Sequence, residues 1–178
     1  DLYIDRKEAR KLDRYTQLAI ISAIQAVKDS GMDLEKVDKD RIGVVYGVGI
    51  GGICTFEQEV GYYAQHVEDG PKFSPFFIPK MIADIASGHI SIRFGFHGPN
   101  YTTTSACASS SNALADAFNL IRLGKANAIL AGGAESAICM CGVGGFNAMK
   151  ALSTRNDDPQ HASRPFSASR DGFVMAEG

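Results

Sequence analysis

The sequence predicts an α/β fold with a largely covered sheet. Patterns typical of strands and of helices alternate along its 178 residues, and 45% of these are hydrophobic. The strand-like runs are continuously apolar, which is typical of parallel sheets with helices on their faces. The length is enough for one well-buried domain and short for two.

The first half of the chain contains three predicted helices and one predicted strand. Apolar residues at helical spacing predict a helix over 16–28, which Ser30 and Gly31 end. Residues 42–47 have the composition of a buried strand. Two helices follow, over 55–67 and 78–86; the first ends at an acidic Gly-Pro turn and the second precedes a turn at 97–99.

The second half alternates in the same way. A strand over 100–106 leads into a helix of about 109–123, which Gly124 ends. A buried strand at 127–131 and a short helix at 142–150 come next. A polar loop with two prolines spans 153–171, and the final residues have the composition of a further strand.

Composition excludes several classes of protein. With 18 basic and 20 acidic residues the net charge is −2, which gives no case for nucleic-acid binding. No apolar run approaches the roughly 18–20 residues of a membrane helix. Four cysteines are too few for a disulfide scaffold, so we expect reduced thiols and a cytoplasmic protein. Cys139 and Cys141 lack a second ligand pair, so we expect no metal site.

Charge is unevenly distributed along the chain. Residues 1–41 hold nine basic and nine acidic side chains, and we expect a solvated surface there. Residues 101–149 hold two of each sign, and we expect that span to be interior. The sequence begins without Met or a signal-peptide pattern, and both ends indicate a piece of a longer protein.

A glycine-rich segment, Gly47-Val-Gly-Ile-Gly-Gly52, follows the first predicted strand. Its spacing matches a dinucleotide-binding loop, but such a fold needs a second strand about 20 residues on that ends in Asp or Glu. A turn at 67–71 lies there instead. The glycines therefore favour a tight strand exit that lines a pocket.

Cys107 is the candidate nucleophile. It lies in Thr103-Thr-Ser-Ala-Cys-Ala-Ser-Ser-Ser111, where a predicted strand turns into a predicted helix. The start of a helix favours a thiolate, and small neighbours leave room for a substrate and expose N–H groups for an oxyanion. A buried structural cysteine is the alternative. The other cysteines, Cys54, Cys139 and Cys141, are expected to be inert core residues, and no histidine has a spacing that places it beside Cys107.

A basic cluster lies near the start of the chain. Helical spacing would place Lys7, Arg10, Lys11 and Arg14 on one face. Acidic residues are interleaved with them, so both an ordinary solvated surface and a docking site for an acidic partner fit the pattern.

Motifs along the whole chain resemble the β-ketoacyl-acyl carrier protein synthases, most closely the synthase II type. The matching segments are Gly49-Ile-Gly-Gly52, Ser74-Pro-Phe-Phe-Ile-Pro79, Ser105-Ala-Cys-Ala-Ser109, Ala131-Gly-Gly-Ala-Glu135, Gly144-Gly-Phe146, Ala151-Leu-Ser-Thr-Arg-Asn-Asp-Asp-Pro159, Ala162-Ser-Arg-Pro-Phe166 and Arg170-Asp-Gly-Phe-Val174. They occur in the order and at the spacing of that family.

This resemblance implies a thiolase-like fold with α/β/α/β/α layers, of which residues 1–178 form most of the N-terminal half of a β-ketoacyl synthase domain. It implies a homodimer that takes substrates on the phosphopantetheine of acyl carrier protein, with no other cofactor. Cys107 would accept the acyl chain as a thioester, and a carbanion from malonyl-carrier protein would then lengthen that chain.

The resemblance also assigns roles to individual residues. Ile50 would help to set chain length, Phe146 would line the acyl channel, and Phe77 would lie near the subunit interface. The carrier protein would dock on a basic patch of five residues: Lys7, Arg10, Lys11, Lys72 and Lys150. The two catalytic histidines of the family have no match here, so no histidine is assigned.

Several alternatives remain open at this point. The protein could serve fatty-acid elongation or a specialised polyketide or polyene pathway, because Ser110-Ser-Asn112 departs from the common family pattern. A non-catalytic dimerisation or carrier-docking subunit is possible, although the retained Cys107 argues against it. A degradative thiolase would need a second catalytic cysteine, and a hydrolase motif is matched only loosely.

Overall fold

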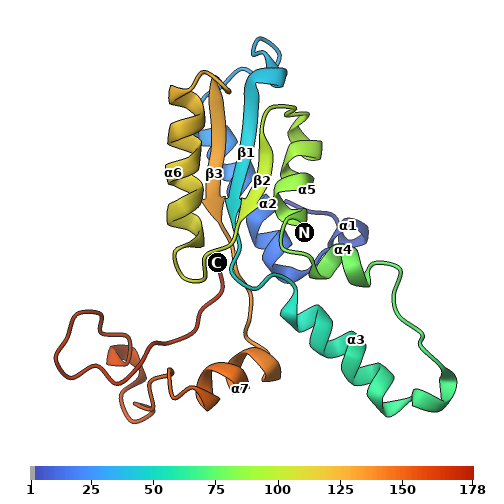
Figure 1. Ribbon diagram of the computed structural model, residues 1–178, viewed down its shortest axis with the longest axis vertical. Coiled ribbons are helices and arrows are strands. Elements are labelled where there is room, and N and C mark those ends of the chain that lie inside the picture. The colour runs from blue at the N-terminus through green and yellow to red at the C-terminus, as the bar shows by residue number, and fades with distance from the viewer. Residues whose placement is uncertain (1–2) are drawn as a thin grey trace.

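The computed structural model describes residues 3–178 and has an α/β architecture around a parallel sheet (Figure 1). The sheet contains β1 (Ile42–Gly47), β2 (Asn100–Thr103) and β3 (Ala128–Gly133) in the order β2-β1-β3. Both neighbours of β1 run parallel to it. The predicted fold class is therefore confirmed, and every residue of β1 is buried, as its apolar sequence predicts.

Helices cover both faces of this sheet. The helix α6 (Ser109–Arg122) lies on one face, while α2 (Arg14–Asp29) and α5 (Ile85–Phe94) lie on the other (Figure 1). The core between the sheet and α2 and α5 includes the fully buried side chains of Tyr15, Ile20, Val44 and Ile90.

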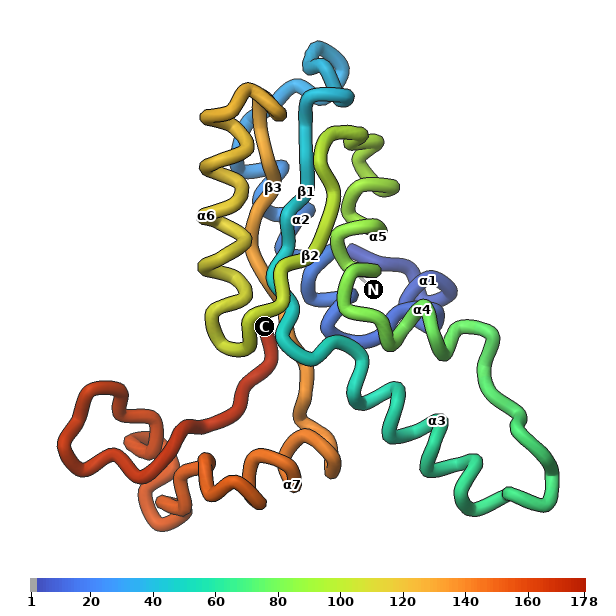
Figure 2. Tube along the Cα trace, viewed as in Figure 1, coloured from blue at the N-terminus to red at the C-terminus, as the bar shows by residue number. Residues whose placement is uncertain are grey.

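The remaining elements lie away from the sheet. The helix α3 (Ile53–Gln65) extends from the body of the molecule to a turn with the short helix η2 (Val67–Asp69), and the chain returns to α4 (Phe77–Met81) (Figure 2). The helix α7 (Met140–Ala148) precedes a long loop with one further turn, η3 (Pro159–His161). Two short elements, α1 (Arg6–Ala9) and η1 (Lys39–Arg41), complete the fold, and none of these helices is long and apolar enough to span a membrane.

The prediction of one helix over 78–86 is wrong. The chain forms α4 and α5, with an extended residue, Ile82, between them (φ −67°, ψ 136°). The Ile82 carbonyl accepts a hydrogen bond of 2.5 Å from the hydroxyl of the fully buried Tyr15. The Tyr15 hydroxyl thus gives the Ile82 carbonyl a hydrogen-bond partner outside a helix, whereas the local apolar periodicity alone predicts that residue 82 is helical.

The prediction that Lys7, Arg10, Lys11 and Arg14 share one helical face is also wrong. α1 ends at Ala9 and α2 begins at Arg14. Between them the chain turns inward, because Leu12 is buried in the core and the buried Asp13 caps α2. The Asp13 carboxylate also accepts a 2.5 Å hydrogen bond from the Thr55 hydroxyl, which fixes the break in the helix.

The expectation that residues 101–149 are interior does not hold for the described chain. α6 packs Ala113 and Ala117 against the sheet, but Leu114, Phe118 and Ile121 on its other side are 57%, 60% and 43% exposed. β3 is half-buried along its length, because it forms an edge of the sheet. Low charge predicted burial correctly for one face of α6 and for a few residues beside β3, such as Ala126, Ala134 and Ser136.

The other predicted elements agree with the structure to within a few residues. The strand predicted over 100–106 ends at Thr103, and α6 begins at Ser109, as predicted. The helices α3 and α7 each begin two residues earlier than expected. The final segment forms no regular strand, although Gly178 and Glu135 exchange two backbone hydrogen bonds of 2.7 and 3.1 Å.

Candidate active site

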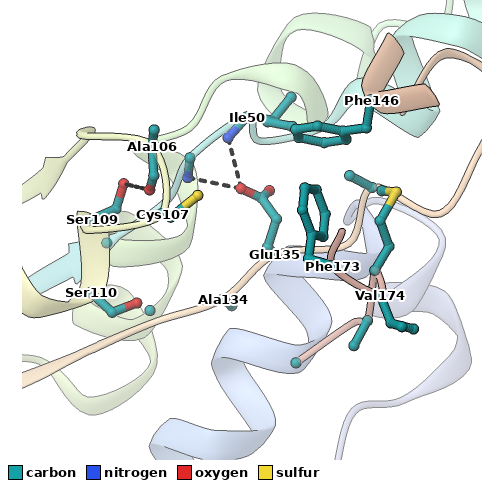
Figure 3. Close-up of a pocket in the computed structure, with 17 residues that line it drawn as sticks. Ile50, Ala106, Cys107, Ser109, Ser110, Ala134, Glu135, Phe146, Phe173 and Val174 are labelled. Carbon is teal, nitrogen blue, oxygen red and sulfur yellow. Dashed lines mark hydrogen bonds between the residues drawn. The ribbon is translucent and has the colours of Figure 1, made fainter. Parts of the chain in front are cut away.

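A cavity of about 480 Å³ lies at the carboxyl ends of β1 and β3 (Figure 3). Ligands of open parallel sheets bind at this edge, beyond the ends of the strands. The last residues of the two strands, Gly47 and Gly133, lie in its wall, together with the start of α6, Phe146 of α7 and the segment 173–178. The structure thus brings together three of the predicted site residues: Cys107, Ile50 and Phe146.

Cys107 lies on a sharp turn between β2 and α6. The residue before it, Ala106, has a left-handed backbone with φ +50°, a conformation that is costly for any residue with a Cβ. The hydroxyl of Ser109 stabilises the turn, because it donates to the Ala106 carbonyl (2.7 Å) and accepts from the Ser105 N–H (2.9 Å). Asn112 donates to the Ser105 hydroxyl at 2.6 Å.

The exposed Cys107 lies two residues before the first residue of α6, as the sequence predicts. The alternative of a buried structural cysteine is therefore wrong. The approach of the strand to this helix requires glycine, because a Cβ on Gly47 would collide with the backbone of Ser109 and Ser110. The small residues around the thiol thus leave it open to the cavity.

The glycine-rich segment forms a concave row of backbone N–H groups, and these are already occupied. Glu135 accepts hydrogen bonds from the N–H groups of Gly49 (2.8 Å), Ile50 (2.8 Å) and Gly51 (3.1 Å) with its two carboxylate oxygens. Figure 3 shows the bond from Ile50. An internal carboxylate takes the place that a dinucleotide phosphate would need. The preference for a pocket-lining strand exit over nucleotide binding agrees with this geometry.

Glu135 is a site residue that the sequence reasoning missed. In the register of the sheet Gly47 lies opposite Gly133, so the residues two positions beyond each strand, Gly49 and Glu135, meet. One signal was available, since Glu135 is one of two acidic residues in the charge-poor span and comes shortly after an apolar strand. A carboxylate in such a place needs donors, and the neighbouring glycine loop supplies them.

Apolar side chains form the other wall of the cavity. The rings of Phe146 and Phe173 meet edge to face, with centroids 5.2 Å apart and planes at 82°. Ile50 is 40% exposed and lies across from Phe146 (Figure 3). Phe173 is a second lining residue that was not singled out. These three side chains give the cavity a surface suited to a hydrocarbon chain.

Phe77 does not line this cavity. It stacks on Phe73 (centroids 5.2 Å apart) and lies 6.2 Å from Phe56, between α3 and α4. These residues belong to the segment that extends from the body, where several large apolar side chains are exposed: Phe56, Tyr62, Phe73, Phe76 and Ile78.

The five predicted docking residues lie on three different segments of the chain. Lys7, Arg10 and Lys11 are exposed in α1 and the turn after it, and the Lys11 amine lies 5.7 Å from the ring centroid of Phe76. Lys72 lies on the loop between η2 and α4, with Asp69 at 4.0 Å. Lys150 follows α7, lines a different cavity with Arg164 and Arg170, and has a left-handed φ of +54°.

None of the four histidines, all within the described residues 3–178, lines the Cys107 cavity. Burial, together with the Cys139 thiol, raises the pKa of Cys54 to about 12, which makes this thiol a poor nucleophile, as expected. Cys141 is exposed rather than in the core, and a hydrogen bond to Glu57 raises its pKa. No group of residues suited to a metal ion occurs in the part of the chain that the structure describes.

Comparisons with known proteins agree on one family. The model of the β-ketoacyl synthase N-terminal domain matches residues 2–178. The 3-oxoacyl-[acyl-carrier-protein] synthase 2 of Staphylococcus aureus is 48% identical over 177 residues, which are 99% of this chain and 43% of that protein. The chain thus spans less than half the length of the curated relatives it matches.

Solved structures show the same fold. A β-ketoacyl synthase from Burkholderia phymatum STM815 superposes with a TM-score of 0.84 at 32% identity, over 98% of this chain and 42% of that one. A chain from the complex of a type II polyketide synthase acyl-carrier protein with its ketosynthase has a TM-score of 0.77 at 23% identity, over 85% of this chain and 43% of that one.

Proposed function

The chain belongs to the β-ketoacyl synthase family, and on that premise we propose that it carries the acyl-transfer half of a 3-oxoacyl-acyl carrier protein synthase. The observation that carries the proposal is the exposed Cys107 thiol at the start of α6, open to a cavity with an apolar wall. The nucleophile and the acyl-binding surface of such an enzyme are thus both within this chain.

The first step is transfer of an acyl group to Cys107. The Cys107 sulfur attacks the carbonyl carbon of an acyl-carrier thioester, and a new C–S bond forms. The bond to the carrier's phosphopantetheine sulfur breaks, and that thiol leaves with the proton that Cys107 loses. The Cys107 N–H, at the start of α6, is suited to stabilise the intermediate oxyanion. The acyl chain then lies along Ile50 and Phe146.

The second step lengthens the chain. Malonyl-carrier protein loses CO₂, and the resulting carbanion attacks the carbonyl carbon of the acyl-Cys107 thioester. The Cys107 sulfur leaves, and a 3-oxoacyl group two carbons longer remains on the carrier. No histidine of residues 3–178 lines the cavity, so this part of the chain places no imidazole there to assist the decarboxylation. We assign the product to fatty-acid elongation.

We also propose the partners of the complete protein. Lys7, Arg10 and Lys11 are exposed together and suit docking of an acidic acyl carrier protein, with Lys72 and Lys150 as separate outer contacts. The exposed aromatic residues of α3 and α4, around Phe77, favour a homodimer through this segment. All four cysteines are free, which suits a cytoplasmic location.

One experiment tests the acyl-transfer step. The complete protein is incubated with an acyl-carrier thioester and its intact mass is measured. We expect a mass increase equal to one acyl group, and none in Cys107→Ala. A wild-type protein that gains no mass, or a gain that persists in Cys107→Ala, would contradict the proposal. A complete protein that binds the carrier but gains no acyl group would instead indicate a non-catalytic carrier-docking subunit.

A further inference from the structure

We infer that Glu135 is a positioning residue that sets the acyl-chain preference of the cavity by holding the loop that carries Ile50. The inference rests on the proposed acyl transfer to Cys107 and deepens it. The observation that supports it is that one carboxylate in the cavity wall accepts hydrogen bonds from three successive backbone N–H groups, at 2.8, 2.8 and 3.1 Å.

Glu135 is the acceptor for the N–H groups in the middle of this loop, and a further backbone bond lies at its end, where Ile53 donates to the Gly51 carbonyl (2.9 Å). The ends of the loop are fixed, because Val48 donates to the Thr103 carbonyl (3.1 Å) and Gly52 donates to the Met81 carbonyl (3.0 Å). Among the described residues, the N–H groups of positions 49–51 have Glu135 as their acceptor and no other. Glycines flank Ile50 on both sides, and Gly51 has φ +78°, so local stiffness does not hold the loop.

Glu135 itself is firmly placed. It follows Ala134, whose N–H donates to the Gly47 carbonyl at 3.1 Å and so extends the pairing of β1 with β3. Its backbone N–H and carbonyl both pair with Gly178. The next residue, Ser136, is fully buried, and its hydroxyl donates to Glu177 at 2.5 Å. The carboxylate is therefore a fixed point to which the N–H groups of residues 49–51 attach.

Ile50 depends on this attachment because its own side chain is not packed in place. It is 40% exposed and faces the cavity across from Phe146 (Figure 3). The depth of the cavity along an acyl chain is thus set by the backbone position of residues 49–51. Gly49 allows the contact, since a Cβ there would lie 2.8 Å from the Glu135 Oε2 atom.

The variant Glu135→Gln keeps the size of the side chain and removes one acceptor together with the negative charge, and the control described below loses the same charge elsewhere. A glutamine side chain has one acceptor oxygen and an NH₂ group that only donates. In either orientation of the amide, at least one of the three loop N–H groups faces another donor. The matched control is Glu59→Gln, because Glu59 also accepts from a backbone N–H, that of Ser74 at 2.9 Å, and does not line the cavity.

The experiment measures rates of acyl transfer to Cys107 in the complete protein by intact mass, with octanoyl- and hexadecanoyl-carrier thioesters. We expect Glu135→Gln to change the ratio of the two rates by about threefold to tenfold, the effect of about one hydrogen bond. Glu59→Gln should leave this ratio within about twofold of wild type, because a general loss of stability lowers both rates together. In an Ile50→Ala background, Glu135→Gln should change the ratio by less than about twofold, because the two act through one loop.

An unchanged ratio in Glu135→Gln, with wild-type protein that is acylated, overturns the inference and leaves the proposed function standing. The inference is also overturned if Glu135→Gln changes the ratio of the two rates equally in the Ile50→Ala and wild-type backgrounds. A wild-type protein without acylation overturns both. If Glu135→Gln does not accumulate in folded form, Gly49→Ala perturbs the same contact from the other side. It is expected to shift the ratio, and an unchanged ratio overturns the inference.

Discussion

One buried hydroxyl supports the turn that presents Cys107, and its removal is predicted to destabilise the protein and slow acyl transfer. Ser109 is 4% exposed and makes two hydrogen bonds, of 2.7 Å to the Ala106 carbonyl and of 2.9 Å from the Ser105 N–H. Each such bond contributes about 0.5–1.5 kcal/mol net. Ser109→Ala is therefore expected to lower the free energy of unfolding by about 1–3 kcal/mol.

The same change should affect the chemistry, because the left-handed Ala106 is stabilised by the Ser109 hydroxyl. A relaxed turn would displace the Cys107 sulfur, and misplacement of a reacting atom by about 1 Å costs up to about a hundredfold in rate. We expect acyl transfer to slow by at least about tenfold.

The assay pairs Ser109→Ala with Ser111→Ala in the complete protein. Ser111 is exposed on the same helix, and its side chain makes no hydrogen bond within residues 3–178. Chemical denaturation measures the loss of stability, and intact mass measures the rate of acylation. If the two variants unfold within about 0.5 kcal/mol of each other and are acylated at equal rates, the role given to the Ser109 hydroxyl is refuted.

Two further predictions concern stability. Hydrogen bonds from Ser136 and Arg14 lower the pKa of Glu177, so its stabilisation is present above about pH 4.5 and is lost as the pH falls through the lowered pKa. The melting temperature of Glu177→Gln should therefore lie a few degrees below wild type at pH 7 and converge with it in acid; a constant difference would contradict this. The 178-residue chain alone should self-associate through the exposed apolar face of α6. Phe118→Lys should therefore raise, severalfold, the protein concentration at which light scattering appears. A wild-type chain that stays monodisperse would disprove this.

Much of the fold was predictable because local patterns determine it. The continuous apolar run of residues 42–47 forms the fully buried β1. The helix predicted from residue 109 is α6, which begins at Ser109. The position of Cys107 just before α6 followed from the change between strand and helix patterns. Ile50 and Phe146 reach the same cavity because glycine loops and helices that follow parallel strands converge at one edge of the sheet.

Other features depend on contacts between residues far apart in the sequence. The break between α4 and α5 is stabilised by the Tyr15 hydroxyl, 67 residues away from Ile82. The break between α1 and α2 depends on Asp13 and its contact with Thr55. Helical periodicity describes which side of a helix is apolar, and it carries no information on a distant partner that ends the helix.

The sequence by itself determined the α/β class, through its alternating strand and helix patterns, and the family, through motifs along the whole chain, and it predicted Cys107 as the nucleophile. Only the tertiary structure decided how the cavity is held. The pairing of Gly47 with Gly133 places Glu135 against the loop of Ile50, and no local pattern specifies the register of two strands that lie more than 80 residues apart. That register places a glycine-rich segment with the spacing of a phosphate-binding loop in the wall of the cavity beside Cys107.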